Sequence, residues 1–164
     1  MDERTRAATY QDVLRVASLL EDEHVEYALI GGYALAFQGI VRLTEDVDIL
    51  VEPSVENARR WVRALSKLPD GAALELVGDD TVHEEPYAIR INDEFTVDVM
   101  NSASGFTWQD MLPYRRRIDG IHVVSLEGLL RMKEHGRLKD PPSECSGPLI
   151  RRASGGTLPA ARDA

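Results

Sequence analysis

The sequence predicts one α+β (α/β) domain in which helices pack on one face of a small mixed β-sheet. Its 164 residues suffice for one domain with a substantial core, but not for two. In the first half, stretches with helical apolar periodicity alternate with short apolar runs, as in strands separated by helices. Later, YAIRI and FTVDVM flank Asn92-Asp93-Glu94 and predict a hairpin.

The individual elements follow from caps and periodicity. Thr9 and Asp12 form a capping-box pattern before a helix whose buried face carries Val13, Val16 and Leu20. We expect strands at 25–30, 47–51 and 121–125, a short helix over 33–38 closed by Gly39, a helix after Ser54, and a last helix over 126–137. Residues 74–77 suggest a further short strand.

Composition limits the possible functions. A net charge of -9 argues against a general nucleic-acid binder. It leaves open a small acceptor, or an RNA met through a local basic patch such as YRRR at 114–117, although a solvated surface turn explains that run more simply. The four histidines lack zinc-ligand spacing.

The cellular setting and the domain boundary are also predicted. The longest apolar run has 10 residues, too few to cross a bilayer, and MDERTRAATY does not resemble a signal peptide. Cys145 is the single cysteine, so no intrachain disulfide is possible, and a reducing, cytoplasmic setting is expected. Because the apolar runs are short, we expect no membrane contact. We assign residues 1–140 to the domain and 141–164, rich in Pro, Gly, Ser and Ala, to a disordered or poorly packed tail.

Asp48 lies within the apolar strand predicted at 47–51, and Asp46 lies directly before it. Because side chains alternate along a strand, Asp46 and Asp48 share one face, about 6–7 Å apart at the backbone. Two carboxylates so close repel unless a cation lies between them, and Mg²⁺ prefers such ligands. Asp98 alternates with apolar neighbours in FTVDVM and can complete a site for two metal ions about 3.5–4 Å apart. Surface acids on an edge strand are the simpler alternative.

The Gly31-Gly32 pair lies between a predicted strand and a predicted helix. Without Cβ atoms, its backbone can approach a phosphate closely. Arg42 and Thr44 precede the Asp46 strand; each can reach phosphate or lie in solvent. Lys133 follows the apolar stripe of the last helix, so it either extends its amine to solvent or binds a buried anion.

These residues resemble a known signature. Ile30-Gly31-Gly32, a gap of 13 residues and Asp46-Val47-Asp48 are similar to the motif of the DNA polymerase β-like nucleotidyltransferase superfamily. RLTEDVDILV and SLEGLLRMKEHGRLKD resemble its small bacterial minimal nucleotidyltransferases, including the AbiEii-like toxin branch. The resemblance covers about residues 10–140 and implies a nucleotidyltransferase-like fold.

The resemblance also implies roles for particular residues. Asp46 and Asp48 would bind two Mg²⁺ ions and the nucleotide, and Asp98 would bind the catalytic ion and help deprotonate the acceptor. Gly31 and Gly32 would hold the β- and γ-phosphates of an NTP. Lys139 matches a family lysine in an RxKD pattern.

The sequence departs from the family at two places. Gly32 replaces a serine found in many members, and PPSECSGP follows Lys139-Asp140 where another helix is expected.

We therefore expect a Mg²⁺-dependent transfer of NMP from an NTP to a hydroxyl acceptor with release of pyrophosphate. The acceptor stays open among a tRNA, a protein and a small molecule, and the base of the NTP is also open. The alternative is a degenerate, non-catalytic relative that acts as a toxin–antitoxin component, with an antitoxin as a possible partner, or as a partner-binding module.

Overall fold

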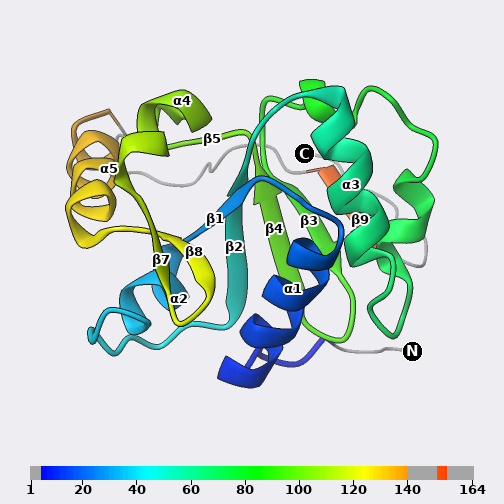
Figure 1. Cartoon of the computed structure of the whole chain (residues 1–164), viewed down its shortest axis with the longest axis horizontal. Helices are drawn as coiled ribbons and strands as arrows, with labels where there is room; N and C mark the ends of the chain where they lie inside the picture. Colours follow the sequence, from blue (N-terminus) through cyan, green and yellow to red (C-terminus); the bar gives the residue numbers. More distant parts are fainter. Residues whose placement is uncertain (1–4, 140–150, 155–164) are drawn as a thin grey trace.

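The computed structural model describes residues 5–139 and 151–154, which form a mixed sheet with helices around it (Figure 1). The strands are β1 (Tyr27–Ile30), β2 (Asp46–Val51), β3 (Ile89–Asn92), β4 (Thr96–Met100), β7 (Arg115–Ile118), β8 (Ile121–Val124) and β9 (Arg151–Ser154), with the short pair β5 (Ser102–Ala103) and β6 (Phe106–Thr107). The α-helices are α1 (Tyr10–Asp22), α2 (Gly31–Ala36), α3 (Val55–Leu65), α4 (Trp108–Met111) and α5 (Leu126–Lys139). The 3-10 turns are η1 (Ala72–Leu76), η2 (Val82–Glu84) and η3 (Leu112–Tyr114).

The sheet confirms the predicted fold class. Its seven strands lie in the order β7-β8-β1-β2-β4-β3-β9. Strand β2 is antiparallel to β1 and parallel to β4, and β4 is antiparallel to β3, so the sheet is mixed. The hairpin predicted around residues 92–94 is the β3–β4 connection. None of the helices in the described part of the chain is long and apolar enough to span a membrane.

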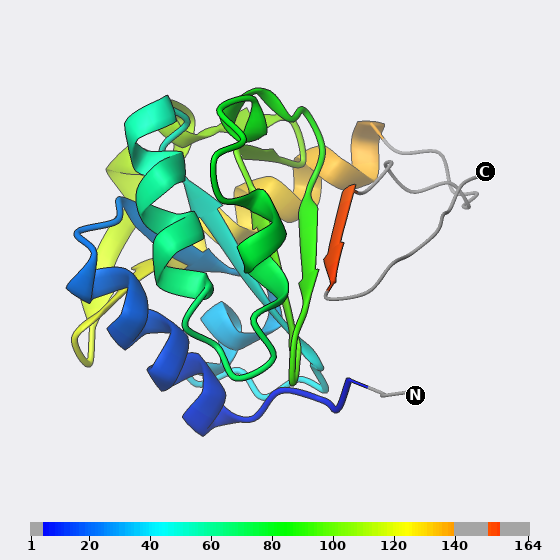
Figure 2. The same cartoon turned by 90° about the vertical axis from the view of Figure 1, so that its right-hand side faces the viewer.

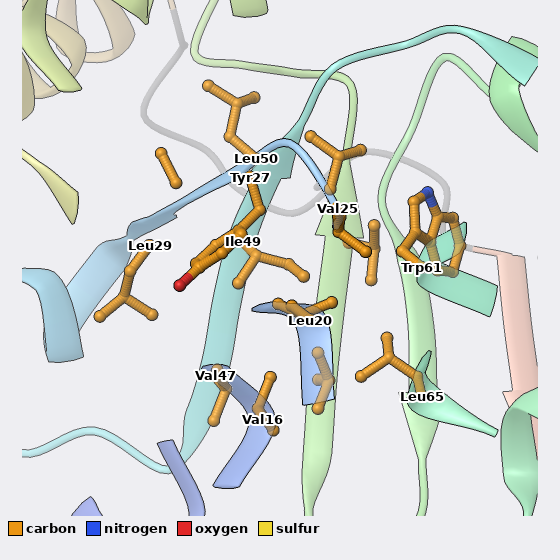
Figure 3. Packing of buried hydrophobic residues seen from close by; sticks show 14 of the residues in the cluster. Val16, Leu20, Val25, Tyr27, Leu29, Val47, Ile49, Leu50, Trp61 and Leu65 are labelled. Atoms are coloured by element: carbon orange, nitrogen blue, oxygen red, sulfur yellow. The ribbon is translucent and has the colours of Figure 1, made fainter. Parts of the chain in front are cut away.

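The main core lies between the sheet and the helices α1 and α3, which share one side of it (Figure 2). Val16 and Leu20 of α1 and Trp61 and Leu65 of α3 point toward the sheet, among the side chains of Val47 and Ile49 (Figure 3). Each such buried side chain contributes about 1.5–3 kcal/mol relative to an exposed one. This packing fixes which face of β2 is apolar and leaves Asp46 and Asp48 for the other.

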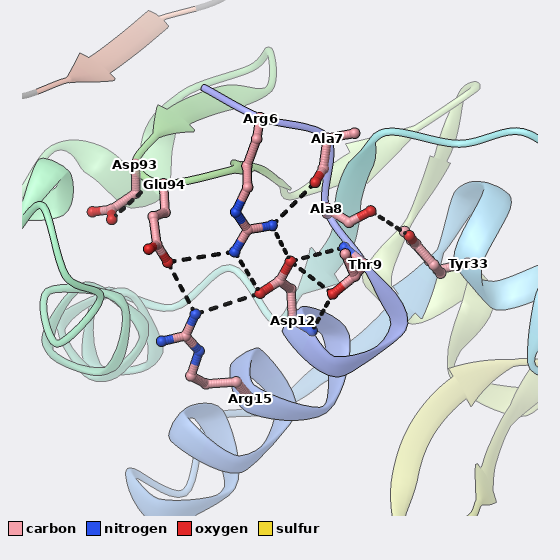
Figure 4. A network of polar contacts seen from close by, with 9 residues as sticks. All are labelled: Arg6, Ala7, Ala8, Thr9, Asp12, Arg15, Tyr33, Asp93 and Glu94. Atoms are coloured by element: carbon pink, nitrogen blue, oxygen red, sulfur yellow. Dashed lines mark hydrogen bonds and ion pairs between the residues drawn. The ribbon is translucent and has the colours of Figure 1, made fainter. Parts of the chain in front are cut away.

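The N-terminal segment is tied to the sheet by a charged network around Asp12 (Figure 4). The predicted capping box is present, since Thr9 Oγ1 accepts from the Asp12 amide and the Asp12 carboxylate accepts from the Thr9 amide. Arg6 donates to both Asp12 oxygens, at 2.6 and 3.0 Å, and Arg15 joins Asp12 to Glu94. These bonds fasten the start of α1 to the β3–β4 turn.

Two predicted elements are wrong. Residues 74–77 are not a strand but end the 3-10 turn η1, because the buried Asp93 carboxylate accepts from the amides of Asp70 and Ala72 and fixes a turn there. Residues 115–117 are not a surface turn but part of β7, which pairs antiparallel with β8. Arginines are well suited to such an edge, because their charges discourage pairing with other chains.

The predicted tail requires a correction as well. Residues 151–154 form β9, which runs parallel to β3 at the edge of the sheet (Figure 2). Backbone pairing needs no periodic apolar face, and the absence of that face was the ground for predicting disorder. Residues 141–150 and 155–164 of the predicted tail lie outside the described residues.

We expect Asp12→Asn to lower the free energy of unfolding at pH 7 by about 1–2 kcal/mol, because the charge-assisted bonds from Arg6 to two carboxylate oxygens are lost and only one neutral acceptor oxygen is left for the Thr9 amide. The hydrogen bonds from Arg6 hold the pKa of Asp12 below its ordinary 3.8. A lowered pKa stabilises the fold above the unfolded pKa, and this contribution fades as the pH falls through and below about 4.

Chemical denaturation of wild type and Asp12→Asn from neutral to acid pH measures this, with the exposed Asp119→Asn as control. The difference between wild type and Asp12→Asn should narrow between about pH 4 and pH 2. A difference that stays constant over that range would contradict the assignment.

Candidate functional site

The three predicted carboxylates lie together on the face of the sheet opposite α1. In β2, Val47 and Ile49 are buried in the core, so the alternating Asp46 and Asp48 project to the other face. Strand β4 runs parallel to β2 with Asp98 aligned with Asp48. Neighbouring strands are about 4.8 Å apart, so these two side chains are immediate neighbours.

A fourth charged residue, Arg90, joins this group from β3. Its Nε and Nη2 donate to the two Asp98 oxygens at 3.0 Å each, and Nη2 also donates to Asp46 Oδ2 at 3.1 Å. The antiparallel register places Arg90 directly beside Asp98. Sequence reasoning missed Arg90, although its alternation with Ile89 and Ile91 and the hairpin register carried the signal.

Burial and mutual repulsion alter the acidity of the aspartates. Burial, followed by the charges of Asp98 and Asp46, raises the pKa of Asp48 to about 7. Burial also raises the pKa of Asp46, partly opposed by Arg90. A raised pKa means that the ionised form of Asp48 is disfavoured in this environment. A cation beside Asp48 would therefore stabilise the ionised carboxylate against burial and against the charges of its acidic neighbours.

The Gly31-Gly32 pair borders these acids. Gly31 has a φ of +77°, and a Cβ on it would overlap the Asp48 carboxylate. A Cβ on Gly32 would lie 2.7 Å from the Thr44 side chain. The helix α2 starts at Gly31 itself, two residues before the predicted start. Both glycines are therefore required by close approach, and the backbone of the turn lies next to the carboxylates.

Beside the acids is an open cleft of about 560 Å³. Five of the predicted nucleotide-binding residues line it: Gly31, Gly32, Arg42, Thr44 and Lys133. Lys133 comes from α5, whereas Arg42 and Thr44 come from the loop between α2 and β2. Gly31 belongs to the cleft and also contacts Asp48, so it connects the two halves of the site. Lys139 ends α5, and its side chain lies outside the described residues.

The walls of the cleft are joined by Gln38, which sequence reasoning also missed. Its amide nitrogen donates to the carbonyl oxygens of Ala34 and Val124 at 3.0 Å each, and its Oε1 accepts from the Leu126 amide at 3.1 Å. Gln38 thus connects α2 with the start of α5. This sets the spacing between the glycine turn and the helix that carries Lys133.

Carboxylate donors on one face suit Mg²⁺ chemically. Among the described residues, however, no three acidic, histidine or cysteine side chains are gathered around one point that could hold a metal ion. Arg90 donates to three of the oxygens of Asp98 and Asp46 that could otherwise bind an ion. The donor set fits a divalent cation, provided that the side chains rearrange.

Comparison with known proteins supports the fold. No family model matches the sequence, and none of the curated proteins matches it. A solved structure from Thermotoga maritima, provisionally described as a nucleotidyltransferase, is similar with a TM-score of 0.54 and 22% identity. The match covers 79% of this chain and 86% of that chain. At this identity the likeness concerns the fold, which is therefore nucleotidyltransferase-like.

The close contact between Gly31 and Asp48 can be tested by measuring the free energy of unfolding of variants. Gly31→Ala should lower the free energy of unfolding by at least about 2 kcal/mol, because the new methyl group meets a left-handed backbone and the Asp48 carboxylate together. Gly78→Ala is the matched control, since Gly78 has a similar φ of +87° but open space around it. It should cost about 1 kcal/mol. Equal losses in urea denaturation would show that Gly31 and Asp48 are not in close contact.

Proposed function

We propose that the protein is a Mg²⁺-dependent nucleotidyltransferase that moves NMP from an NTP to a hydroxyl acceptor. In this reaction the acceptor oxygen forms a bond to the α-phosphorus, the bond from that phosphorus to the pyrophosphate oxygen breaks, and the hydroxyl loses its proton. The observation that carries the proposal is the alignment of Asp48 with Asp98 beside Gly31, at the end of a cleft with cationic side chains.

Each residue has a role suited to its position. Asp46, Asp48 and Asp98 would hold one or two Mg²⁺ ions, which neutralise phosphate charge when bound. The backbone amides of Gly31 and Gly32 would bind the β- and γ-phosphates, because no Cβ blocks their approach. Lys133, Arg42 and Thr44 would hold the triphosphate in the cleft, and Lys139 would assist at the end of α5. Such catalysis consists mainly of positioning and charge stabilisation.

For the acceptor we propose only its chemical class, a compound with a hydroxyl group. A tRNA, a protein hydroxyl and a small molecule all present the required oxygen, and any of the NTPs fits the chemistry described. A cytoplasmic location supplies NTP and Mg²⁺. Labelled NTPs incubated with the protein and cell extract would identify the acceptor by where the label is found.

A second candidate is a non-catalytic relative that binds a partner, such as the antitoxin of a toxin–antitoxin pair in the AbiEii-like branch. Two observations favour it: Arg90 engages the carboxylates, and Gly32 stands where many family members have serine. This candidate predicts nucleotide binding without transfer to any acceptor, or no nucleotide binding.

Thermal melts of wild type and variants with Mg²⁺-ATP and Mg²⁺-GTP test whether a nucleotide binds at the proposed site. Binding to the folded state alone should stabilise wild type by about 2.7 kcal/mol at a hundredfold excess over the dissociation constant. Asp48→Asn should abolish this gain while leaving the stability without ligand equal or slightly higher, because it removes both a metal ligand and a repelling charge.

Lys133→Ala should reduce the nucleotide-dependent gain without removing the response to Mg²⁺ alone, since its amine would touch only phosphate. Asp119→Asn, which changes the same charge in the β7–β8 turn, is the control and should behave as wild type. A full gain in Asp48→Asn would refute the assigned site. No gain in wild type with any nucleotide at millimolar concentration would favour the non-catalytic candidate.

A further inference from the structure

The side chain of Arg90 is held by three hydrogen bonds to acidic groups. It engages both oxygens of Asp98, in the parallel two-bond geometry that guanidinium and carboxylate groups favour, and one oxygen of Asp46. Asp98 is only 6% exposed, and the other side chain that hydrogen bonds with it, Asp48, is itself an acid. Arg90 is therefore the principal compensation for a buried carboxylate.

The fold leaves Arg90 little choice of position. Ile89 and Ile91 are buried in the core, so the alternation of β3 directs Arg90 to the acidic face. Its strand lies between β4 and β9, within the sheet. The side chain starts beside Asp98 in the strand register and reaches across β4 to Asp46 on β2.

A divalent cation and this guanidinium need the same oxygens. Mg²⁺ binds carboxylate oxygens at about 2.0–2.1 Å and requires near-octahedral geometry. A divalent ion held by Asp46 and Asp98 would share these oxygens with the Arg90 guanidinium, and the two positive charges would repel. The two cations therefore compete for the same carboxylate oxygens, and each weakens the binding of the other.

We propose that Arg90 is a positioning residue that acts as an internal counter-cation, occupying Asp46 and Asp98 until a divalent ion displaces it. The proposal rests on the proposed function, because it concerns the same carboxylates. It adds that metal binding is linked to release of Arg90, so the wild-type site binds divalent ions more weakly than its three carboxylates would alone.

The opposite role for Arg90 would be to orient Asp98 for the metal. The two roles give opposite results when the arginine is removed. If Arg90 competes, a neutral replacement binds divalent ions more tightly; if it orients Asp98, the replacement binds them more weakly. In both cases the variant is less stable without metal, so stability alone does not separate them, whereas metal affinity does.

The experiment is a calorimetric titration of full-length protein with Mn²⁺ alone, for wild type, Arg90→Gln and Arg90→Lys. Arg59→Gln is the matched control, because Arg59 makes the same two-bond contact with a carboxylate, that of Asp80, on an exposed surface. We expect Arg90→Gln to melt below wild type without metal and to bind Mn²⁺ at least about tenfold more tightly, given the repulsion removed at this range. Arg90→Lys should bind with intermediate affinity, and Arg59→Gln as wild type.

A second measurement needs no variant. The Arg90 side-chain Nε–H resonance, followed by ¹⁵N NMR in wild type, should move as Mg²⁺ is added, at a concentration that matches the binding isotherm. This keeps the proposal testable if Arg90→Gln does not fold.

The outcomes separate this proposal from the proposed function. Equal or weaker Mn²⁺ binding by Arg90→Gln, or an Nε–H resonance that does not move as wild type takes up Mg²⁺, would overturn the counter-cation role and leave the nucleotidyltransferase assignment standing. Absence of divalent binding in wild type and all variants would overturn both. Tighter binding by Arg90→Gln in a protein that transfers no nucleotide would support the counter-cation role and reject the catalytic one.

Discussion

The parallel pairing of β2 with β4 is the constraint on which the site depends. It aligns Asp48 with Asp98 on neighbouring strands, on the face that the core does not use. A shift of one residue would turn one of the two carboxylates into the core, because side chains alternate along a strand. The apolar partners Val47, Ile49, Val97 and Val99 oppose that shift, since each is buried in the observed register. The packing of the core thus determines where the charges lie.

Three aspartates on one face of the sheet repel one another, and groups in the same site reduce this repulsion. Arg90 engages two of the three aspartates, while the third, Asp48, responds through a pKa raised to about 7. Such strongly shifted groups are common where a protein binds or transforms ligands. The adjacent cleft, with Gly31 and Lys133 on its walls, gives these charges a space in which a phosphate-bearing molecule can be held.

Much of this arrangement followed from sequence, because it depends on local periodicity. The capping box at Thr9 and Asp12 and the shared face of Asp46 and Asp48 need only neighbouring residues to be predicted. The 3-10 turn at Ala72–Leu76 could not be predicted in this way, because it depends on Asp93, about twenty residues further along the chain. The contact of Arg90 with Asp46 likewise depends on the order of strands in the sheet, which local periodicity does not specify.

The edge strand β9 illustrates the same limit, since its pairing with β3 joins segments about sixty residues apart. Its sequence has no alternation to indicate a strand, and backbone bonding to an available edge is sufficient to form one. The likeness to the Thermotoga maritima structure extends over most of the chain and concerns the fold. The identity of the bound ligand therefore has to come from the site itself.

The most direct test of the account is a crystal structure of the protein with Mn²⁺ and a non-hydrolysable NTP analogue, with the ions located by anomalous scattering. Manganese should be bound by Asp46, Asp48 and Asp98, and the triphosphate should lie against Gly31 and Gly32 within reach of Lys133. Manganese and nucleotide bound elsewhere on the molecule, with the three aspartates free of metal, would contradict it.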